Sequence, residues 1–136
     1  PLADHLARHR LADLFLDTLP FNAGTTASDA LWMGLPVLTQ VGRSFAARMA
    51  ASLLHSLGLD ELIAETGQDY VLRGIDLARE PARLKRIRKT LDDCRATAPL
   101  FDGRTLASPL EEAFVEMVRR WRQGLPASPI YLSGSA

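Results

Sequence analysis

Residues 22 to 29 combine side chains and spacing that could bind a phosphate group. Gly24 precedes two threonines, Thr25 and Thr26, at the point where a helical pattern begins. The start of a helix leaves backbone N–H groups unpaired and carries a partial positive charge, so it attracts anions. Glycine allows the chain to approach a phosphate closely, and the threonine hydroxyls add donors at the same place. The stretch therefore predicts a binding site for a nucleoside diphosphate.

Asp29 lies one helical turn after the two threonines, so its carboxylate shares roughly their face of the helix. From there it could accept hydrogen bonds from a ribose while the helix start holds the phosphates. A simpler interpretation stays open at this point: one threonine caps the helix, and Asp29 is a solvated acid favoured by the helix dipole. The sequence contains neither the GxGxxG nor the GxxxxGK[ST] fingerprint of nucleotide sites.

Two short apolar runs flank this stretch and predict parallel strands. Residues 14–16 lie between two aspartates, a pattern typical of a strand buried on both faces. Gly34 and Pro36 end the intervening helix and lead into a second strand at residues 37–39. Strand, helix and strand in this order predict a right-handed βαβ crossover, and such sheets bind ligands at the carboxyl ends of their strands.

Helical patterns account for most of the remaining chain. We expect helices or helical turns near residues 2–10, 44–57, 60–64, 67–79, 81–94 and 105–121. The last three of these helices have apolar positions that we expect to face inward. They are Tyr70, Val71, Ile75 and Leu77 in residues 67–79, Leu84, Ile87, Leu91 and Cys94 in residues 81–94, and Leu106, Leu110, Phe114, Met117 and Trp121 in residues 105–121. The expected fold class is α/β, with a short parallel sheet and a mostly helical C-terminal half.

Length and composition narrow the classes of function. A chain of 136 residues is about one domain long. Sixteen Lys and Arg balance sixteen Asp and Glu, so we expect neither nucleic acid nor a membrane as a partner. The single Cys94 fits the cytoplasm. The chain begins at Pro1 without a Met, and we expect it to be a piece of a longer protein.

Two histidines, His5 and His9, stand four residues apart in the first expected helix and could share a metal ion. Neither an HExxH motif nor an acidic partner accompanies them, and Arg8 would repel a divalent cation, so we expect no metal. Stacking of His5 or Arg8 on a nucleotide base is the better functional interpretation, beside the alternative of an exposed helix face.

A longer resemblance supports the phosphate-site interpretation. The run LADLFLDTLPFNAGTTASDALWMGLPVLT, followed by GRSFAARMAASLL and GLDELIA, resembles the C-terminal part of the O-GlcNAc transferase and SPINDLY family, from about Pro1 to Trp121. The resemblance implies a GT-B architecture of two Rossmann-like domains, with the nucleotide sugar bound mainly by the C-terminal one. Residues 1–123 would be the last portion of that donor domain, and residues 124–136 a tail rich in Pro, Gly and Ser.

The resemblance also implies roles for individual residues. The family's donor site maps onto Gly24, Thr25 and Thr26 for the diphosphate, Asp29 for the ribose, and His5 and Arg8 for the base. Gly24 stands where the animal enzyme has a histidine, and Leu2 where it has a lysine. Glycine before the threonine pair also occurs in the plant SPINDLY branch, which uses a GDP-sugar. The resemblance therefore leaves both UDP-GlcNAc and a GDP-sugar open as the donor.

The activity implied is transfer of a sugar, GlcNAc being favoured, from a nucleoside diphosphate to Ser or Thr hydroxyls of acceptor proteins. The alternatives are a GDP-fucose-dependent O-fucosyltransferase of the same family and a non-catalytic nucleotide-binding or docking module. The general base would lie outside this chain or be a donor phosphate. We expect this chain alone to be inactive, to require the catalytic domain and tetratricopeptide repeats as partners, and to be able to self-associate through exposed surface.

Overall fold

The computed structural model describes residues 1–132, which fall into two compact units divided between Phe101 and Asp102. The first unit contains, in order, α1 (Leu2–Ala7), η1 (Arg8–Leu11), β1 (Phe15–Leu16), α2 (Thr25–Trp32), β2 (Val37–Gln40), η2 (Ala46–Arg48), α3 (Met49–Ser56), η3 (Asp60–Leu62), β3 (Ile63–Ala64), α4 (Gly67–Arg79), α5 (Pro81–Cys94) and η4 (Pro99–Phe101). The second unit contains α6 (Gly103–Arg122) and the segment that follows it.

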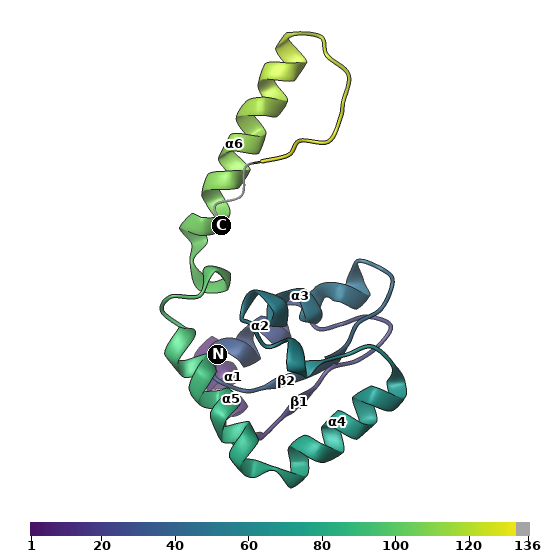
Figure 1. Ribbon diagram of the computed structural model, residues 1–136. Helices are drawn as coiled ribbons and strands as arrows, with labels where there is room; N and C mark the ends of the chain where they lie inside the picture. Colours follow the sequence, from purple (N-terminus) through teal and green to yellow (C-terminus); the bar gives the residue numbers. More distant parts are fainter. Residues whose placement is uncertain (133–136) are drawn as a thin grey trace. The chain divides into compact units, whose positions relative to one another are not determined.

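A three-stranded parallel sheet in the order β1-β2-β3 forms the centre of the first unit. Leu16 pairs with Leu38, and Thr39 pairs with Ile63. Helices α2 and α3 lie on one side of the sheet and α4 on the other (Figure 1). This arrangement confirms the predicted α/β class, with its short parallel sheet and mostly helical C-terminal half.

Helix α2 ends where the sequence predicts. Gly34 adopts a φ of +78°, which L side chains rarely allow. Its N–H donates to the Leu31 carbonyl, and the Leu35 N–H donates to the Ala30 carbonyl, so that two carbonyls at the helix end are satisfied. The chain then turns directly into β2, which completes the strand, helix and strand predicted around the phosphate stretch.

Leucines from both helical layers and from the central strand build the core. Those that are at most 1% exposed are Leu31, Leu38, Leu54, Leu62, Leu77 and Leu91. They come from α2, β2, α3, η3, α4 and α5, so every layer of the unit contributes. The sheet and the start of α2 are therefore held by a continuous apolar core.

Two predictions about the strands are wrong. Residues 60–64 are not a helical turn throughout, because only Asp60–Leu62 form one turn, and Ile63–Ala64 extend to pair with β2 as a third strand. Leu16 is 58% exposed although residues 14–16 were expected to be covered on both faces. The reason is that β1 lies at the edge of the sheet and packs against β2 on one side alone.

The inward face of α4 is narrower than its sequence pattern predicts. Leu77 is buried and Tyr70 is partly buried, but Val71 is 57% exposed and Ile75 is 42% exposed. The predicted inward orientation of Val71 and Ile75 is therefore wrong. A single helix laid on a three-stranded sheet covers it with one stripe, and these two residues fall beside that stripe.

The second unit is built on the 20-residue helix α6. Asp102 caps it by accepting the Arg104 N–H at 3.0 Å. The predicted core stripe is wrong for Leu110, Phe114, Met117 and Trp121, which are between 44% and 79% exposed, because the described part of this unit contains little besides α6 to pack on. The Leu106 side chain and the end of the tail, residues 133–136, lie outside the described residues. None of the helices in residues 1–132 has the length and apolarity required to cross a membrane.

Candidate functional site

The candidate site lies at the carboxyl end of β1, where the chain leaves the sheet and returns as α2. A cavity of about 300 Å³ opens there, and its lining includes Leu16, Phe21, Asn22, Gly24 and Thr26. The cavity therefore joins the end of the strand to the first turn of the helix. In parallel α/β sheets this is the edge at which ligands bind.

The first turn of α2 has unpaired donors. Gly24 is the N-cap residue and supplies no side chain, and no side chain caps the helix within the described part of the chain. The first N–H to find a backbone acceptor is that of Ser28, which donates to Gly24; over residues 1–132 those of residues 24–27 have none. The interpretation that a threonine merely caps the helix is therefore wrong. Thr25 and Thr26 are both exposed beside these free N–H groups.

Gly24 is not required by the backbone. Its φ is −101°, outside the left-handed region that favours glycine. A Cβ at this position would lie 3.5 Å from the Met49 Cε, which is ordinary van der Waals contact. The position can therefore hold a side chain, and the absence of one leaves the helix start open.

His5 and Asp29 are brought together from two helices that are adjacent in space but 24 residues apart in sequence. The His5 Nε2 donates to the Asp29 Oδ2 at 3.3 Å, and the two side chains are 33% and 26% exposed. The His9 ring packs edge-on against the His5 ring with centroids 5.2 Å apart, and its Nδ1 donates to the Leu6 carbonyl. These contacts fix the His5 imidazole beside Asp29 on the first turns of α2.

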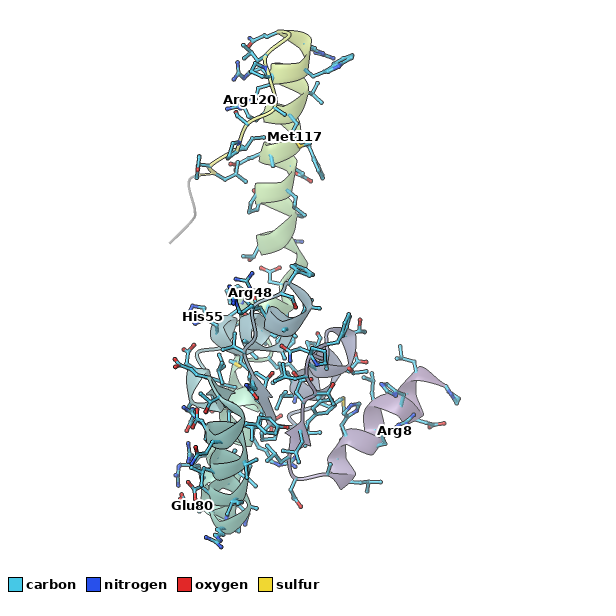
Figure 2. All side chains as sticks on the ribbon, turned by 90° about the vertical axis from the view of Figure 1, so that its right-hand side faces the viewer. Arg8, Arg48, His55, Glu80, Met117 and Arg120 are labelled. Atoms are coloured by element: carbon cyan, nitrogen blue, oxygen red, sulfur yellow. The ribbon has the colours of Figure 1, made fainter. Side chains whose placement is uncertain are left out.

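Arg8 is exposed at the junction of α1 and η1 (Figure 2). Over residues 1–132 no hydrogen bond or ion pair holds its guanidinium. Of the residues expected to contact a nucleotide, Gly24, Thr25 and Thr26 thus form the helix start, His5 and Asp29 form a linked pair, and Arg8 extends into solvent.

A group of buried polar residues behind the loop escaped prediction from the sequence. Asp17, Asn22 and Thr39 are at most 7% exposed, and the Tyr70 hydroxyl donates to the Asp17 carbonyl at 2.8 Å. Burial raises the pKa of the Tyr70 phenol, and the Asp17 charge raises it further. The one available signal was the position of Asp17, a carboxylate placed directly after an apolar strand.

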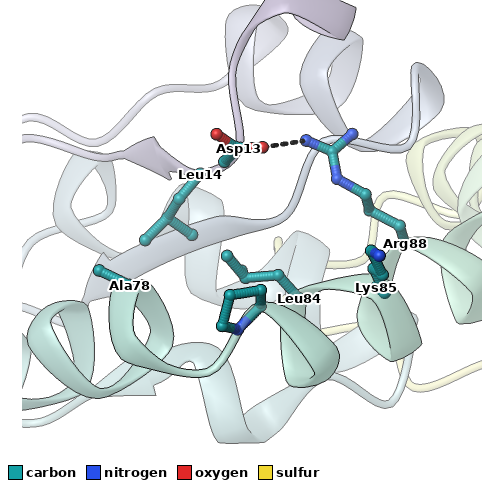
Figure 3. A pocket seen from close by; sticks show the side chains of 7 residues that line it. Asp13, Leu14, Ala78, Leu84, Lys85 and Arg88 are labelled. Carbon is teal, nitrogen blue, oxygen red and sulfur yellow. Dashed lines mark ion pairs between the residues drawn. The ribbon is translucent and has the colours of Figure 1, made fainter.

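A second cavity, of about 430 Å³, lies at the other end of β1 and is lined by Asp13, Leu14, Ala78, Leu84, Lys85 and Arg88, among others (Figure 3). The Arg88 guanidinium donates to the Ala12 carbonyl and lies 3.9 Å from the Asp13 carboxylate. Its charge is thus engaged with the protein, whereas the N–H groups at the start of α2 are free. Among the described residues there is no cluster of three or more His, Cys, Asp or Glu side chains that could hold a metal ion.

Comparison with known proteins identifies relatives of this chain. The model of the family described as Glycosyl transferase family 41 matches residues 1–110. A probable UDP-N-acetylglucosamine–peptide N-acetylglucosaminyltransferase SPINDLY from Hordeum vulgare is 36% identical over 121 residues, which cover 89% of this chain and 13% of that protein. A UDP-N-acetylglucosamine–peptide N-acetylglucosaminyltransferase from Caenorhabditis elegans is 35% identical over 127 residues, covering 93% and 11%.

Among solved structures, an O-GlcNAc transferase from Thermobaculum terrenum, in its K341M form, superposes with a TM-score of 0.84 at 35% identity. The match covers 91% of this chain and 24% of that one. The resemblance predicted from the sequence is confirmed by both kinds of comparison. This chain spans about an eighth of the length of the curated relatives.

Proposed function

Because the chain belongs to glycosyl transferase family 41, we propose that it forms the donor-binding portion of a protein O-glycosyltransferase. The donor would be a nucleoside diphosphate sugar, with UDP-GlcNAc favoured because the relative from Caenorhabditis elegans is named as a UDP-N-acetylglucosamine-dependent transferase and the solved relative from Thermobaculum terrenum as an O-GlcNAc transferase. The acceptors would be Ser or Thr hydroxyls of proteins.

One observation carries the proposal: the start of α2 presents free N–H groups beside a cavity at the carboxyl end of β1. Attack of a hydroxyl on the anomeric carbon releases a nucleoside diphosphate, so negative charge develops on the leaving phosphate. Fixed donors aimed at that charge stabilise the transition state without having to reorganise. The N–H groups of residues 24–27 and the hydroxyls of Thr25 and Thr26 would serve this role.

The remaining nucleotide contacts follow from the neighbouring side chains. Asp29 would accept hydrogen bonds from the ribose hydroxyls through Oδ1, since its Oδ2 already accepts the His5 N–H. His5 and Arg8 would lie against the base. Arg8 is free to move toward a ligand because it is exposed.

The parts of the reaction that this site does not supply are proposed to lie elsewhere in the same enzyme. The described residues hold no candidate general base in the cavity beside Thr26 other than Asp17, whose oxygens are already bound by three donors. We therefore expect no turnover from this chain alone. Exposed apolar side chains around the site, among them Leu16, Phe21 and Phe45, would be covered by the catalytic domain, or by a second copy in its absence.

A GDP-sugar is the second candidate donor, and Gly24 is the observation that favours it. The resemblance supports this alternative, because glycine also precedes the threonine pair in the plant SPINDLY branch, whereas the animal enzyme has a histidine there. A third candidate, a non-catalytic docking module, would retain the fold without using the free N–H groups. We also propose that residues 1–123 belong to the donor-binding portion, with residues 124–136 as a tail, and that the protein acts in the cytoplasm.

Titration with UDP, GDP and the two sugar nucleotides tests the proposal. A ligand present at 100 times its Kd stabilises the folded chain by about 2.7 kcal/mol, which raises the melting temperature by several degrees. Replacing Thr25 and Thr26 together by Ala should reduce this shift without unfolding the chain, because the two hydroxyl donors are lost while the backbone N–H groups remain. The matched control is Thr90→Ala with Thr97→Ala. Both threonines are exposed, and each hydroxyl donates to a backbone carbonyl of its own helix or turn. A well-folded chain with no shift at millimolar concentrations of any of the four ligands would contradict the proposal.

A further inference from the structure

Asp17 has an unusual position for a carboxylate. It follows β1 directly and is 7% exposed. Its Oδ1 accepts two backbone N–H groups, from Thr18 at 2.8 Å and from Ala23 at 2.7 Å. Its Oδ2 accepts the Thr39 hydroxyl at 2.6 Å. One side chain thus holds both ends of the loop that leads to the phosphate stretch and ties that loop to the neighbouring strand.

The pairing of the strands makes this contact possible. Because Leu16 pairs with Leu38 in the parallel register, the next residue of each strand, Asp17 and Thr39, also lie side by side. The Thr39 side chain is completely buried, so its hydroxyl is a fixed donor. The Thr39 hydroxyl consequently anchors Oδ2 to β2, and this contact fixes the position of Oδ1 relative to the loop.

The loop bond to Ala23 lies next to the proposed site. Ala23 immediately precedes Gly24, the N-cap of α2, and over residues 1–132 the unpaired N–H groups begin at residue 24. Asn22 reinforces the same bend, because its Nδ2 donates to the Thr18 carbonyl at 2.9 Å and its N–H donates to the Ala46 carbonyl at 3.0 Å. The Ala23 N–H, which donates to Asp17, is therefore adjacent to the Gly24 N–H, the first that is free for a ligand.

Charge alone would not place a carboxylate here. Within the described residues no cation forms an ion pair with Asp17, so its burial is compensated by hydrogen bonds only. A negative charge near an anion site also opposes ligand binding. The advantage of Asp17 must lie in geometry, because the two oxygens of one small side chain accept three hydrogen bonds. Two of these bonds close the loop, and the third anchors it to β2.

We propose that Asp17 is the positioning residue of the diphosphate site: by joining the Thr18 and Ala23 amides to Thr39, it sets the direction in which the N–H groups at the start of α2 point. This role rests on the proposed function, since it concerns the same helix start. Asp17 itself touches no reacting atom. It acts through the loop that it holds.

Three variants of the full 136-residue chain test the role, with UDP as the probe. Asp17→Ala removes both acceptor oxygens, and with them three hydrogen bonds, and should weaken UDP binding at least tenfold by calorimetry. Asp17→Asn can still accept both amides and can donate to the Thr39 hydroxyl, so it should stay within threefold of the parent Kd despite losing the charge. Thr39→Val removes only the anchor on β2 and should weaken binding by an intermediate factor. Asp13→Ala, a carboxylate at the other end of β1 that is 96% exposed, is the control and should leave the Kd unchanged.

A second measurement reports on the loop without any nucleotide. Amide hydrogen exchange of Ala23 should be slow in the parent chain, at least tenfold faster in Asp17→Ala, and slow again in Asp17→Asn. If Asp17 only stabilised the fold, Asp17→Ala would lower the melting temperature. Asp17→Asn would then not restore both the parent Kd and the slow exchange of the Ala23 amide. If Asp17→Ala is too unstable to study, Thr39→Val and Asp17→Asn still decide the matter.

The outcomes separate this inference from the proposed function. No UDP binding by the parent chain contradicts the diphosphate site itself, and the Ala23 exchange rates then decide whether Asp17 holds the loop. Binding by the parent chain with an equal Kd in a folded Asp17→Ala overturns the positioning role and leaves the diphosphate site standing. A Kd in Asp17→Asn as poor as that in Asp17→Ala also overturns it, because geometry would then be insufficient.

Discussion

The His5 Nε2 donates to the Asp29 Oδ2 at 3.3 Å and so links α1 to the first turns of α2. The resemblance assigns the two residues to different parts of a nucleotide, the base and the ribose, yet their side chains form one hydrogen-bonded unit. This arrangement orients the Asp29 carboxylate in advance, so that less side-chain freedom is lost when a ribose binds. Energetic coupling between the two residues follows.

A double-mutant cycle should measure that coupling. Asp29→Ala should weaken UDP binding at least tenfold, His5→Phe should weaken it less, and the double variant should be little worse than Asp29→Ala alone. Residues joined in one hydrogen-bond network commonly show interaction energies of about 0.5–3 kcal/mol. Strictly additive effects would show instead that His5 contacts the nucleotide independently of Asp29.

The chain offers a matched control for this cycle. His55 and Asp60 form a second His–Asp pair, with Nδ1 and Oδ1 2.7 Å apart, at the end of α3, where the side chains are 78% and 61% exposed. His55→Phe removes the same type of bond from a different surface. It should leave the UDP affinity unchanged, and any loss there would indicate a general effect of removing a histidine.

Gly24→His tests what the glycine contributes to the site. The backbone at Gly24 has a φ of −101°, and a Cβ would be in ordinary contact with the Met49 Cε, so the variant should fold with little change in stability. An imidazole at this position can donate to the diphosphate, and a hydrogen bond to a charged group contributes about 1.5–3 kcal/mol. UDP should therefore bind at least about tenfold more tightly in calorimetry.

Gly103→His is the control for this gain of affinity. Gly103 is the first residue of α6, and no atom of the described residues lies within 4 Å of the Cβ that a side chain would add. The substitution should fold and leave the UDP affinity unchanged. If Gly24→His binds UDP no better than the parent chain, the helix start does not face the diphosphate.

Local sequence was sufficient to predict the start of α2 but not the residues behind it. Gly24, the two threonines and the later Gly34 are local signals, and the structure places a helix between them. Asp17 and Thr39 are 22 residues apart and meet only because β1 and β2 pair in one particular register. Strand register depends on packing across the whole sheet, which no short pattern records.

Apolar periodicity overpredicted the core for a related reason. A pattern shows which residues share a helix face, but not how wide a surface the rest of the chain can cover. In α4 the sheet covers Leu77 and leaves Val71 exposed. Among the described residues of its own unit, the apolar face of α6 meets only the segment after Gly124, so Phe114 and Trp121 stay exposed.

Leu77 and Val71 should therefore differ sharply when truncated. Leu77 is 1% exposed, and Leu77→Ala should lower the free energy of unfolding by about 2–5 kcal/mol through lost burial and the cavity left behind. Val71 lies on the same helix and is 57% exposed, so Val71→Ala should change it by at most about 0.5 kcal/mol. Urea denaturation of both variants measures the difference. Similar losses would mean that a surface of the same chain covers Val71 in solution.

Glu116 should give α6 a stability that depends on acid pH. Hydrogen bonds from Arg119 and Arg120 lower the pKa of its carboxyl from 4.5 to about 2. The Arg119 Nε lies 2.6 Å from Oε2, and the Arg120 Nε lies 2.8 Å from Oε1. A pKa that is lower in the folded state means that protonation favours unfolding. The contribution of Glu116 is thus complete above pH 4.5 and is lost as the pH falls toward 2.

Carboxyl NMR of the full chain can follow this titration directly, and amide exchange along α6 can follow the helix. Glu116→Gln should remove the loss of protection between pH 4.5 and 2 around residues 116–120, because a neutral side chain has nothing to titrate there. The first turn of α6 should still lose protection in acid, since hydrogen bonds from Arg104 and Thr105 also lower the pKa of the capping Asp102. Glu111→Gln changes an exposed glutamate of the same helix and should leave the loss in place. Arg119→Gln with Arg120→Gln should return the Glu116 pKa toward 4.5. A Glu116 carboxyl that titrates near 4.5 in the unsubstituted chain would mean that the two arginines do not hold it in solution.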